Sequence, residues 1–223
     1  MTSLPTLTLP RTDVAPNVLP AAPWPDAATV SLVRSTDGGP PSQPTTVHLI
    51  VASDALWVRF HCTDRDAWGT HTVRDAPLWE EEAVEIFLAP LADDGPPSPF
   101  PPRYVEIEAS PRGTLFDAVV HNPTGERRGM SVDAGWDLPG LEARVVPAGI
   151  GDDWTATLRL PWVGLLAAFP GVGSRPPRRW RANLYRIERP RDGDDEFTAW
   201  SPTLADPPDF HRPARFGWLV VAC

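Results

Sequence analysis

The chain has 223 residues and a mass of 24.4 kDa, which suits a single domain. Its 20 basic and 29 acidic residues give a net charge of -9, so a nucleic-acid partner is not expected. All 20 basic residues are arginine, which excludes lysine Schiff-base chemistry and a P-loop lysine.

The N-terminal segment, residues 1–27, is rich in proline and is expected to form an extended arm before a single domain over residues 28–223. It lacks a positive region followed by an apolar one, so no signal peptide is recognisable. No run of about 18 apolar residues is present, so no membrane partner is expected. The default expectation is a cytoplasmic protein, with export by another route left open.

Short stretches of alternating apolar and polar residues follow, separated by Pro, Gly, Asp and Asn. The predicted strands cover residues 28–34, 46–52, 55–63, 82–89, 103–109, 114–121, 141–146, 154–160, 179–188, 197–200 and 216–221. A helix is predicted over residues 161–169, because Pro161 suits a first turn and Pro170 ends it. The fold class is therefore all-β, an antiparallel β-sandwich of the jelly-roll or immunoglobulin-like type with at most one or two short helices.

The ten tryptophans divide by their surroundings. Trp57, Trp154, Trp180 and Trp218 lie in or beside apolar strands and are expected in the core. Trp79 follows a proline and precedes three glutamates, so it is expected to begin a strand at one end of the sandwich.

The period of two in a strand predicts what its two faces carry. One face of neighbouring strands is aliphatic, while the opposite face carries the set Glu85, Phe87, Tyr104, Glu106, Glu108, Arg181, Asn183 and Tyr185. Aromatic rings among hydrogen-bonding groups suit a sugar, which has an apolar C–H face and a rim of hydroxyls. An ordinary solvated face is the alternative interpretation.

Four segments resemble the family 9 carbohydrate-binding modules, in order, between about residues 45 and 221. Residues 78–88 (LWEEEAVEIFL) resemble the family pattern of Trp-Glu, two acidic or polar residues, then small-Val-Glu-Ile-Phe. Residues 210–217 (FHRPARFG) resemble the block with an aromatic residue, a proline and a basic residue before Phe-Gly. Residues 154–162 resemble the strand that ends in a Pro-Trp corner, and residues 181–186 the Asn-aromatic-Arg strand.

The resemblance implies a DOMON-like β-sandwich that grips one or two terminal sugar units without catalysis. The two aromatic walls fall on Trp79 and on Phe210, where the family has a second tryptophan. The family glutamate that binds hydroxyls falls on Glu85, and a family arginine falls on Glu106. His211 adjoins Phe210 and offers a further hydrogen bond. The expected ligand-binding set is Trp79, Glu85, Glu106, Asn183, Phe210 and His211.

Calcium occurs in the family and takes carboxylate oxygens, so it is the one candidate cofactor. Its ligands are not assigned, since Asp64, Asp66, Asp75 and the acidic run 192–195 are expected to be solvated turns. The two cysteines, Cys62 and Cys223, are too few for a disulfide framework or a cysteine-based zinc site. A monomer is expected, with a carbohydrate ligand and a glycoside hydrolase of polysaccharide catabolism as candidate partners.

Two other function classes remain open. A DOMON-type haem or redox module would draw on Met130, with His61 or His121. A glycoside hydrolase would pair Glu85 with Glu106 or Glu108, since two carboxylates about 5–9 Å apart perform acid/base work on glycosidic bonds.

Overall fold

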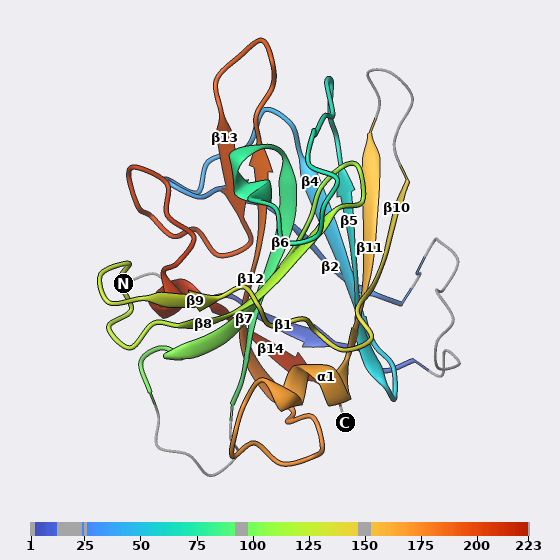
Figure 1. Ribbon diagram of the computed structural model, residues 1–223, viewed down its shortest axis with the longest axis vertical. Helices are drawn as coiled ribbons and strands as arrows, with labels where there is room; N and C mark the ends of the chain where they lie inside the picture. Colours follow the sequence, from blue (N-terminus) through green and yellow to red (C-terminus); the bar gives the residue numbers. More distant parts are fainter. Residues whose placement is uncertain (1–2, 13–23, 25, 92–97, 147–152, 223) are drawn as a thin grey trace.

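The computed structural model describes residues 3–12, 24, 26–91, 98–146 and 153–222. Two β-sheets pack face to face (Figure 1), which confirms the predicted all-β sandwich. The strands are β1 (Thr6–Leu9), β2 (Ala28–Ser31), β3 (Val33–Arg34), β4 (Thr45–Val51), β5 (Ala55–Cys62), β6 (Ala83–Pro90), β7 (Arg103–Ala109), β8 (Leu115–His121), β9 (Ser131–Asp133), β10 (Glu142–Val146), β11 (Trp154–Pro161), β12 (Arg179–Glu188), β13 (Glu196–Ala199) and β14 (Gly217–Val221). The helical elements in the described part are α1 (Trp162–Ala167) and the 3-10 turns η1 (Leu78–Glu80) and η2 (Pro213–Arg215).

The larger sheet has the strand order β1-β14-β12-β6-β7-β8-β9, and β13 pairs with both β12 and β3. The smaller sheet has the order β10-β11-β5-β4-β2. All pairs are antiparallel except β1 with β14. The predicted hairpins β4–β5, β7–β8 and β10–β11 are present as antiparallel pairs.

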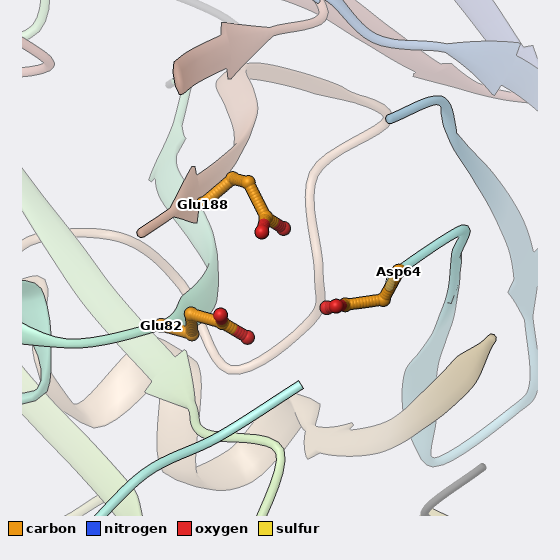
Figure 2. A group of neighbouring side chains, drawn as sticks. All are labelled: Asp64, Glu82 and Glu188. Atoms are coloured by element: carbon orange, nitrogen blue, oxygen red, sulfur yellow. The ribbon is translucent and has the colours of Figure 1, made fainter. Parts of the chain in front are cut away.

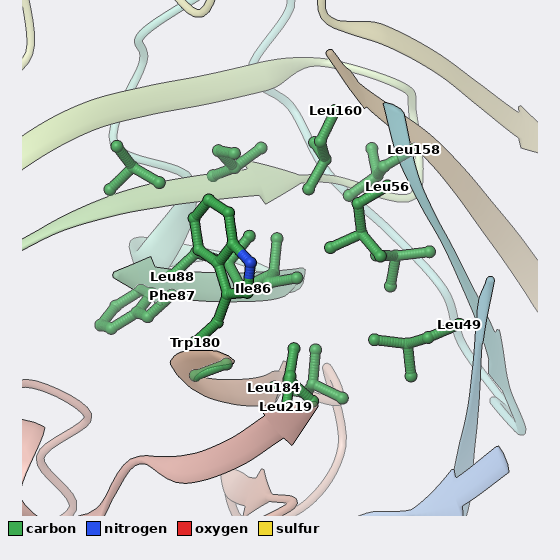
Figure 3. Close-up of a cluster of buried hydrophobic side chains, with 14 of the residues drawn as sticks. Leu49, Leu56, Ile86, Phe87, Leu88, Leu158, Leu160, Trp180, Leu184 and Leu219 are labelled. Atoms are coloured by element: carbon green, nitrogen blue, oxygen red, sulfur yellow. The ribbon is translucent and has the colours of Figure 1, made fainter. Parts of the chain in front are cut away.

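The core lies between the two sheets and is aliphatic. Alternate side chains of β6 and β12 face inward and meet those of β4, β5 and β11. Figure 3 shows this contact, with Leu49, Leu56, Leu158 and Leu160 on one side and Ile86, Leu88, Trp180, Leu184 and Leu219 on the other. This burial of apolar surface is the main term that holds the two sheets together.

The structure differs from several of the predictions made from the sequence. The N-terminal segment contains β1, which joins the larger sheet beside β14, while residues 1–2, 13–23 and 25 of the expected arm lie outside the described residues. Trp79 does not begin a strand but sits in the 3-10 turn η1, where Pro77 precedes the turn at a φ of -72°. Strand β9 was not predicted, because its three residues are all exposed and show no inward-facing apolar side chain.

The tryptophans expected in the core follow the prediction with one exception. Trp57, Trp154 and Trp180 are almost fully buried. Trp218 is only half-buried, and the guanidiniums of Arg179 and Arg181 lie over its ring at 4.7 Å from the centroid. Cation–π contacts therefore cover it where aliphatic packing was expected.

The outer face of the larger sheet is not solvated. The segment between β13 and β14 folds back over it, where Tyr185 donates a hydrogen bond to the carbonyl of Phe210 at 2.9 Å and Phe216 packs against Phe87. Aromatic side chains on this face are thereby buried instead of exposed. In the described part of the chain, no helix has the length and apolar character needed to cross a bilayer.

Candidate functional site

A pocket of about 590 Å³ lies over the outer face of the larger sheet. Its lining comes from β6, β7, β8, β9, β12 and β13, from η1, from the loops on either side of β9, and from the C-terminal segment. Of the six expected ligand-binding residues, five line it: Trp79, Glu85, Glu106, Phe210 and His211. Residues far apart in sequence therefore meet at one cavity.

Trp79 provides an exposed aromatic surface at the pocket. Its residue surface is 44% exposed, which is unusual for tryptophan. The ring meets that of Phe116 edge to face, with centroids 5.2 Å apart. Arg189 donates to the carbonyl of Trp79 at 3.2 Å. These contacts hold the residue in place while leaving ring surface free to meet a ligand.

Phe210 is buried, being only 7% exposed, although it lines the pocket. It packs on Tyr185 and meets Phe197 edge to face, with centroids 6.0 Å apart. Of the two expected aromatic walls, Trp79 therefore exposes more ring surface to a ligand than Phe210 does.

Carboxyl groups lie at the floor of the pocket, where Glu85 and Glu106 line the cavity and Glu108 is buried next to them. Glu85 on β6 is directly opposite Glu108 on β7, and Glu106 lies two residues away on the same face. Within the described residues, one oxygen of each carboxyl lies within 4.8 Å of an oxygen of the other two. Burial and the neighbouring carboxyls raise the pKa of Glu85 and of Glu108 well above the ordinary range, and burial raises the pKa of Glu106 to about 7. At neutral pH the three groups therefore hold protons between them.

His211 faces this floor as a neutral ring. Its Nδ1 is hydrogen-bonded to the hydroxyl of Tyr104 at 2.8 Å, and its Nε2 lies 3.9 Å from a Glu106 oxygen. Burial, together with the charge of Arg127, lowers the pKa of His211 to about 4. The imidazole is thus uncharged at neutral pH and does not neutralise Glu106.

Asn183 does not belong to the pocket lining. Its amide nitrogen donates to the hydroxyl of Tyr185 at 2.9 Å and to the carbonyl of Ser201 at 2.8 Å. Its amide oxygen accepts from the backbone nitrogens of Ser201 and Leu184. The side chain is fully committed to holding the segment after β13 against β12, so a contact with ligand is not available to it.

Met130, named above only as a haem ligand, also lines the pocket. The lining residues that sequence reasoning missed are Phe116, Arg127, Val132, Ala134, Ile187, Arg189, Phe197 and Pro208. Ile187 lies two residues after Tyr185 on the same face of β12, so a longer reading of that strand's period would have found it. Arg127 comes from a loop, and no periodicity in the sequence points to it.

A second buried acidic group lies where the two sheets meet. Asp64 follows β5, Glu82 precedes β6 and Glu188 ends β12, and their carboxylates point toward one another (Figure 2). Arg186 donates to Asp64 at 2.7 Å and also to Glu188. Asp64 was expected in a solvated turn, which is wrong, since it is buried and also accepts from the indole of Trp154 at 2.9 Å. The ion pairs join the smaller sheet to the larger.

This group fits calcium only in part. Buried oxygens without a hydrogen-bond partner occur in this region on Glu82 (Oε1), Glu188 (Oε1) and Gln43 (Oε1). Calcium takes about six to eight oxygen ligands, while both oxygens of Asp64 are already used. Burial and neighbouring carboxylates raise the pKa of Glu82 to about 9, so it carries a proton at neutral pH. Arg186 and that proton already balance most of the negative charge.

Comparison with solved structures shows the same fold in carbohydrate-binding proteins. A putative carbohydrate-binding protein from Bacteroides uniformis superposes with a TM-score of 0.74 at 18% identity, over 99% of this chain and 100% of that one. A family 9 carbohydrate-binding module from Caldicellulosiruptor kristjanssonii, solved with cellotriose, gives 0.63 at 10% identity, over 97% and 93%. The same type of module from that organism, solved with glucose, gives 0.59 at 11% identity, over 96% and 95%.

Sequence comparison agrees with this fold. A relative named "Extracellular protein" from Arthroderma benhamiae is 24% identical over 212 residues, which is 91% of this chain and 88% of the relative. The family model of carbohydrate-binding family 9 matches residues 41–221, which cover both the Trp79 block and the C-terminal segment. The chain therefore belongs to carbohydrate-binding family 9.

Proposed function

We propose that this chain binds one or two terminal sugar units of a glycan in the pocket, without catalysis. Trp79 stacks on the apolar face of the sugar, and Phe210 forms the opposite wall. Glu85 hydrogen-bonds the hydroxyls, with Glu106 and His211 beside it. Asn183 is left out of this proposal, because its amide is already bonded within the protein.

The observation that carries the proposal is the pairing of the exposed Trp79 ring with a pocket floor that has unused hydrogen-bonding groups. Glu85 is only 2% exposed and lines the pocket. A buried polar group without a partner is costly, so a ligand that brings hydrogen bonds to it gains affinity. A sugar supplies both a C–H face for the indole and hydroxyl donors for the carboxyl.

The solved family 9 modules guide the choice of ligands. Those of Caldicellulosiruptor kristjanssonii were solved with cellotriose and with glucose. Glucose and β-1,4-linked glucose oligomers are therefore the first neutral sugars to test here.

Isothermal titration calorimetry with a panel of mono- and oligosaccharides tests the proposal. We expect dissociation constants in the micromolar to millimolar range, about -8 to -4 kcal/mol. The Glu85→Gln variant should bind more weakly with its thermal unfolding temperature retained. Absence of binding to every sugar by the folded wild type would contradict the proposal.

The two other function classes have less support. Of the residues named for haem, only Met130 lines the pocket, and the side chains of His61 and His121 do not. The carboxyls of Glu85 and Glu106 lie close together, as the two carboxyls of a glycoside hydrolase do. Turnover of aryl glycosides that is lost in Glu85→Gln would favour that function. The cytoplasmic location, the monomeric state and a glycoside hydrolase partner stay predictions.

A further inference from the structure

We propose that the preferred ligand of this pocket is an amino sugar, whose ammonium group binds the carboxyls of Glu85 and Glu106, next to the buried Glu108. This inference rests on the proposed function and names the chemical class of its sugar. It also gives a supporting role to Glu108, which does not line the pocket but has a carboxyl oxygen within 4.8 Å of oxygens of Glu85 and Glu106.

The first observation is that the floor carboxyls lack a positive partner. In the described part of the chain, no arginine forms an ion pair with Glu85, Glu106 or Glu108. Glu85 lines the pocket, and among the described residues no group donates a hydrogen bond to it. His211 Nε2 lies 3.9 Å from an oxygen of Glu106, but its ring is neutral. The charge of Arg127 acts on Glu85 and Glu106 without forming an ion pair with either. Glu85 and Glu106 therefore line the cavity without an ion-pair partner among the described arginines.

The second observation concerns the arginines of the pocket. Arg127 Nε lies 2.8 Å from an oxygen of Asp209, and Arg189 is paired with Asp195. Each guanidinium is thus already balanced by an acidic group of its own. The floor keeps its excess of carboxyls even though two arginines line the cavity.

The third observation is the geometric match to an ammonium group. One oxygen from each of the three carboxyls lies within 4.8 Å of the others, on one face of two paired strands. An ammonium group has three N–H donors and no acceptor, so it can donate to Glu85 and Glu106 at once. A nearby cation favours the ionised form of a carboxyl, so binding of the ammonium group displaces protons that the floor holds at neutral pH. The resulting hydrogen bonds between charged groups are roughly twice as strong as neutral ones. A hydroxyl in the same position supplies only one donor and no charge.

The test is calorimetry on the wild-type protein with glucosamine, glucose and N-acetylglucosamine at one pH and low salt. These sugars differ only at the second carbon, as an ammonium, a hydroxyl or a neutral amide. We expect glucosamine to bind about tenfold more tightly than glucose, because charge-assisted hydrogen bonds exceed neutral ones. N-acetylglucosamine should lose this advantage, since it carries no charge.

Matched variants assign the preference to the floor. Glu106→Gln and Glu108→Gln each remove one carboxyl and should reduce the ratio of glucosamine to glucose affinity severalfold. Glu80→Gln removes the same charge from an exposed residue outside the pocket lining and should leave that ratio unchanged. Circular dichroism shows whether each variant is folded. The comparison of the three sugars on the wild-type protein tests the inference even if a variant does not fold.

The outcomes separate this inference from the proposed function. Equal or tighter binding of glucose overturns the amino-sugar inference while the proposed function stands. Glucose binding that needs added calcium, with no preference for glucosamine, also overturns it, because a metal would then occupy the floor. Absence of binding to any of the sugars would remove the proposed function and the inference together.

Discussion

The ring of Phe210 lies face to face on the ring of Tyr185, with centroids 4.1 Å apart and planes 12° apart. The Tyr185 hydroxyl also donates to the carbonyl of Phe210 at 2.9 Å. One face of the Phe210 ring is therefore used within the protein. Because Trp79 is exposed and Phe210 is buried, we expect Trp79 to be the binding residue of the two walls and Phe210 to be largely structural.

This division predicts different costs of removing the two rings. Phe210→Ala should lower the free energy of unfolding by about 3–5 kcal/mol, because it opens a cavity beside Tyr185 and Phe197. Trp79→Ala should lower it by about 1 kcal/mol or less, as is usual for a half-exposed side chain. Urea denaturation of both variants measures the difference. Equal destabilisation by the two substitutions would contradict the assignment.

Arg186 is predicted to be a main link between the two sheets. Arg186→Met should destabilise the domain by about 3–5 kcal/mol, because it leaves the buried carboxylates of Asp64 and Glu188 without their cation. The control is Arg191→Met, which breaks an ion pair with the less buried Asp66 and should cost about 1 kcal/mol or less. Urea denaturation gives both values, and a loss as small as the control's would show that the ion pairs add little.

Stability should fall as the pH rises from 7 to 9. Burial raises the pKa of Glu82 from the ordinary 4.5 to about 9 in the native state. Between these values the native chain holds a proton that the unfolded chain has lost, so each rise in pH favours unfolding. Glu188, whose pKa burial raises to about 7, acts in the same direction at lower pH. His211 does not oppose this, because its native pKa is about 4 and its ordinary value is 6.5.

Urea denaturation at pH 7, 8 and 9 measures this fall, and Glu82→Gln should reduce it. A wild type whose unfolding free energy stays constant or increases over this range would be inconsistent with a protonated, buried Glu82.

Calcium should add little stability at the group of Asp64, Glu82 and Glu188. A ligand raises the unfolding temperature only in proportion to its binding to the native state, and Arg186 already pairs with two of the three carboxylates. Thermal unfolding in calcium chloride and in EDTA should give the same midpoint. A higher midpoint in calcium that disappears in Glu188→Gln would instead assign calcium to this group.

The strands of the sandwich were predictable because short-range physics sets them. Pro, Gly and Asp end the strands, and the period of two separates an aliphatic face, such as that of Ile86 and Leu88, from the face of Glu85. Neighbouring strands with the right faces then bring Glu85 and Glu106 together. The shared face of Glu85 and Glu106 was thus predictable for neighbouring strands, while the family resemblance supplied their assignment to a ligand site.

The rest of the site depends on contacts between distant residues. The sequence suggested that Asn183 could bind ligand, but its side-chain amide is hydrogen-bonded to the backbone of Ser201, 18 residues further along the chain. Asp64 looked solvated, yet its partner Arg186 lies 122 residues further on. The C-terminal segment covers the outer face of the larger sheet through side chains such as Phe210. This segment is a loop without a periodic pattern, so its sequence does not predict the contact.

The central claim is that Trp79 is the stacking surface for a sugar. Calorimetric titration of a sugar that binds the wild type, repeated with Trp79→Ala, tests it most directly. We expect affinity to fall about 30-fold or more, since loss of an aromatic anchor costs about 2 kcal/mol. Trp218→Ala, at a half-buried tryptophan outside the pocket lining, should bind as the wild type does. Unchanged affinity in a folded Trp79→Ala variant would contradict the claim.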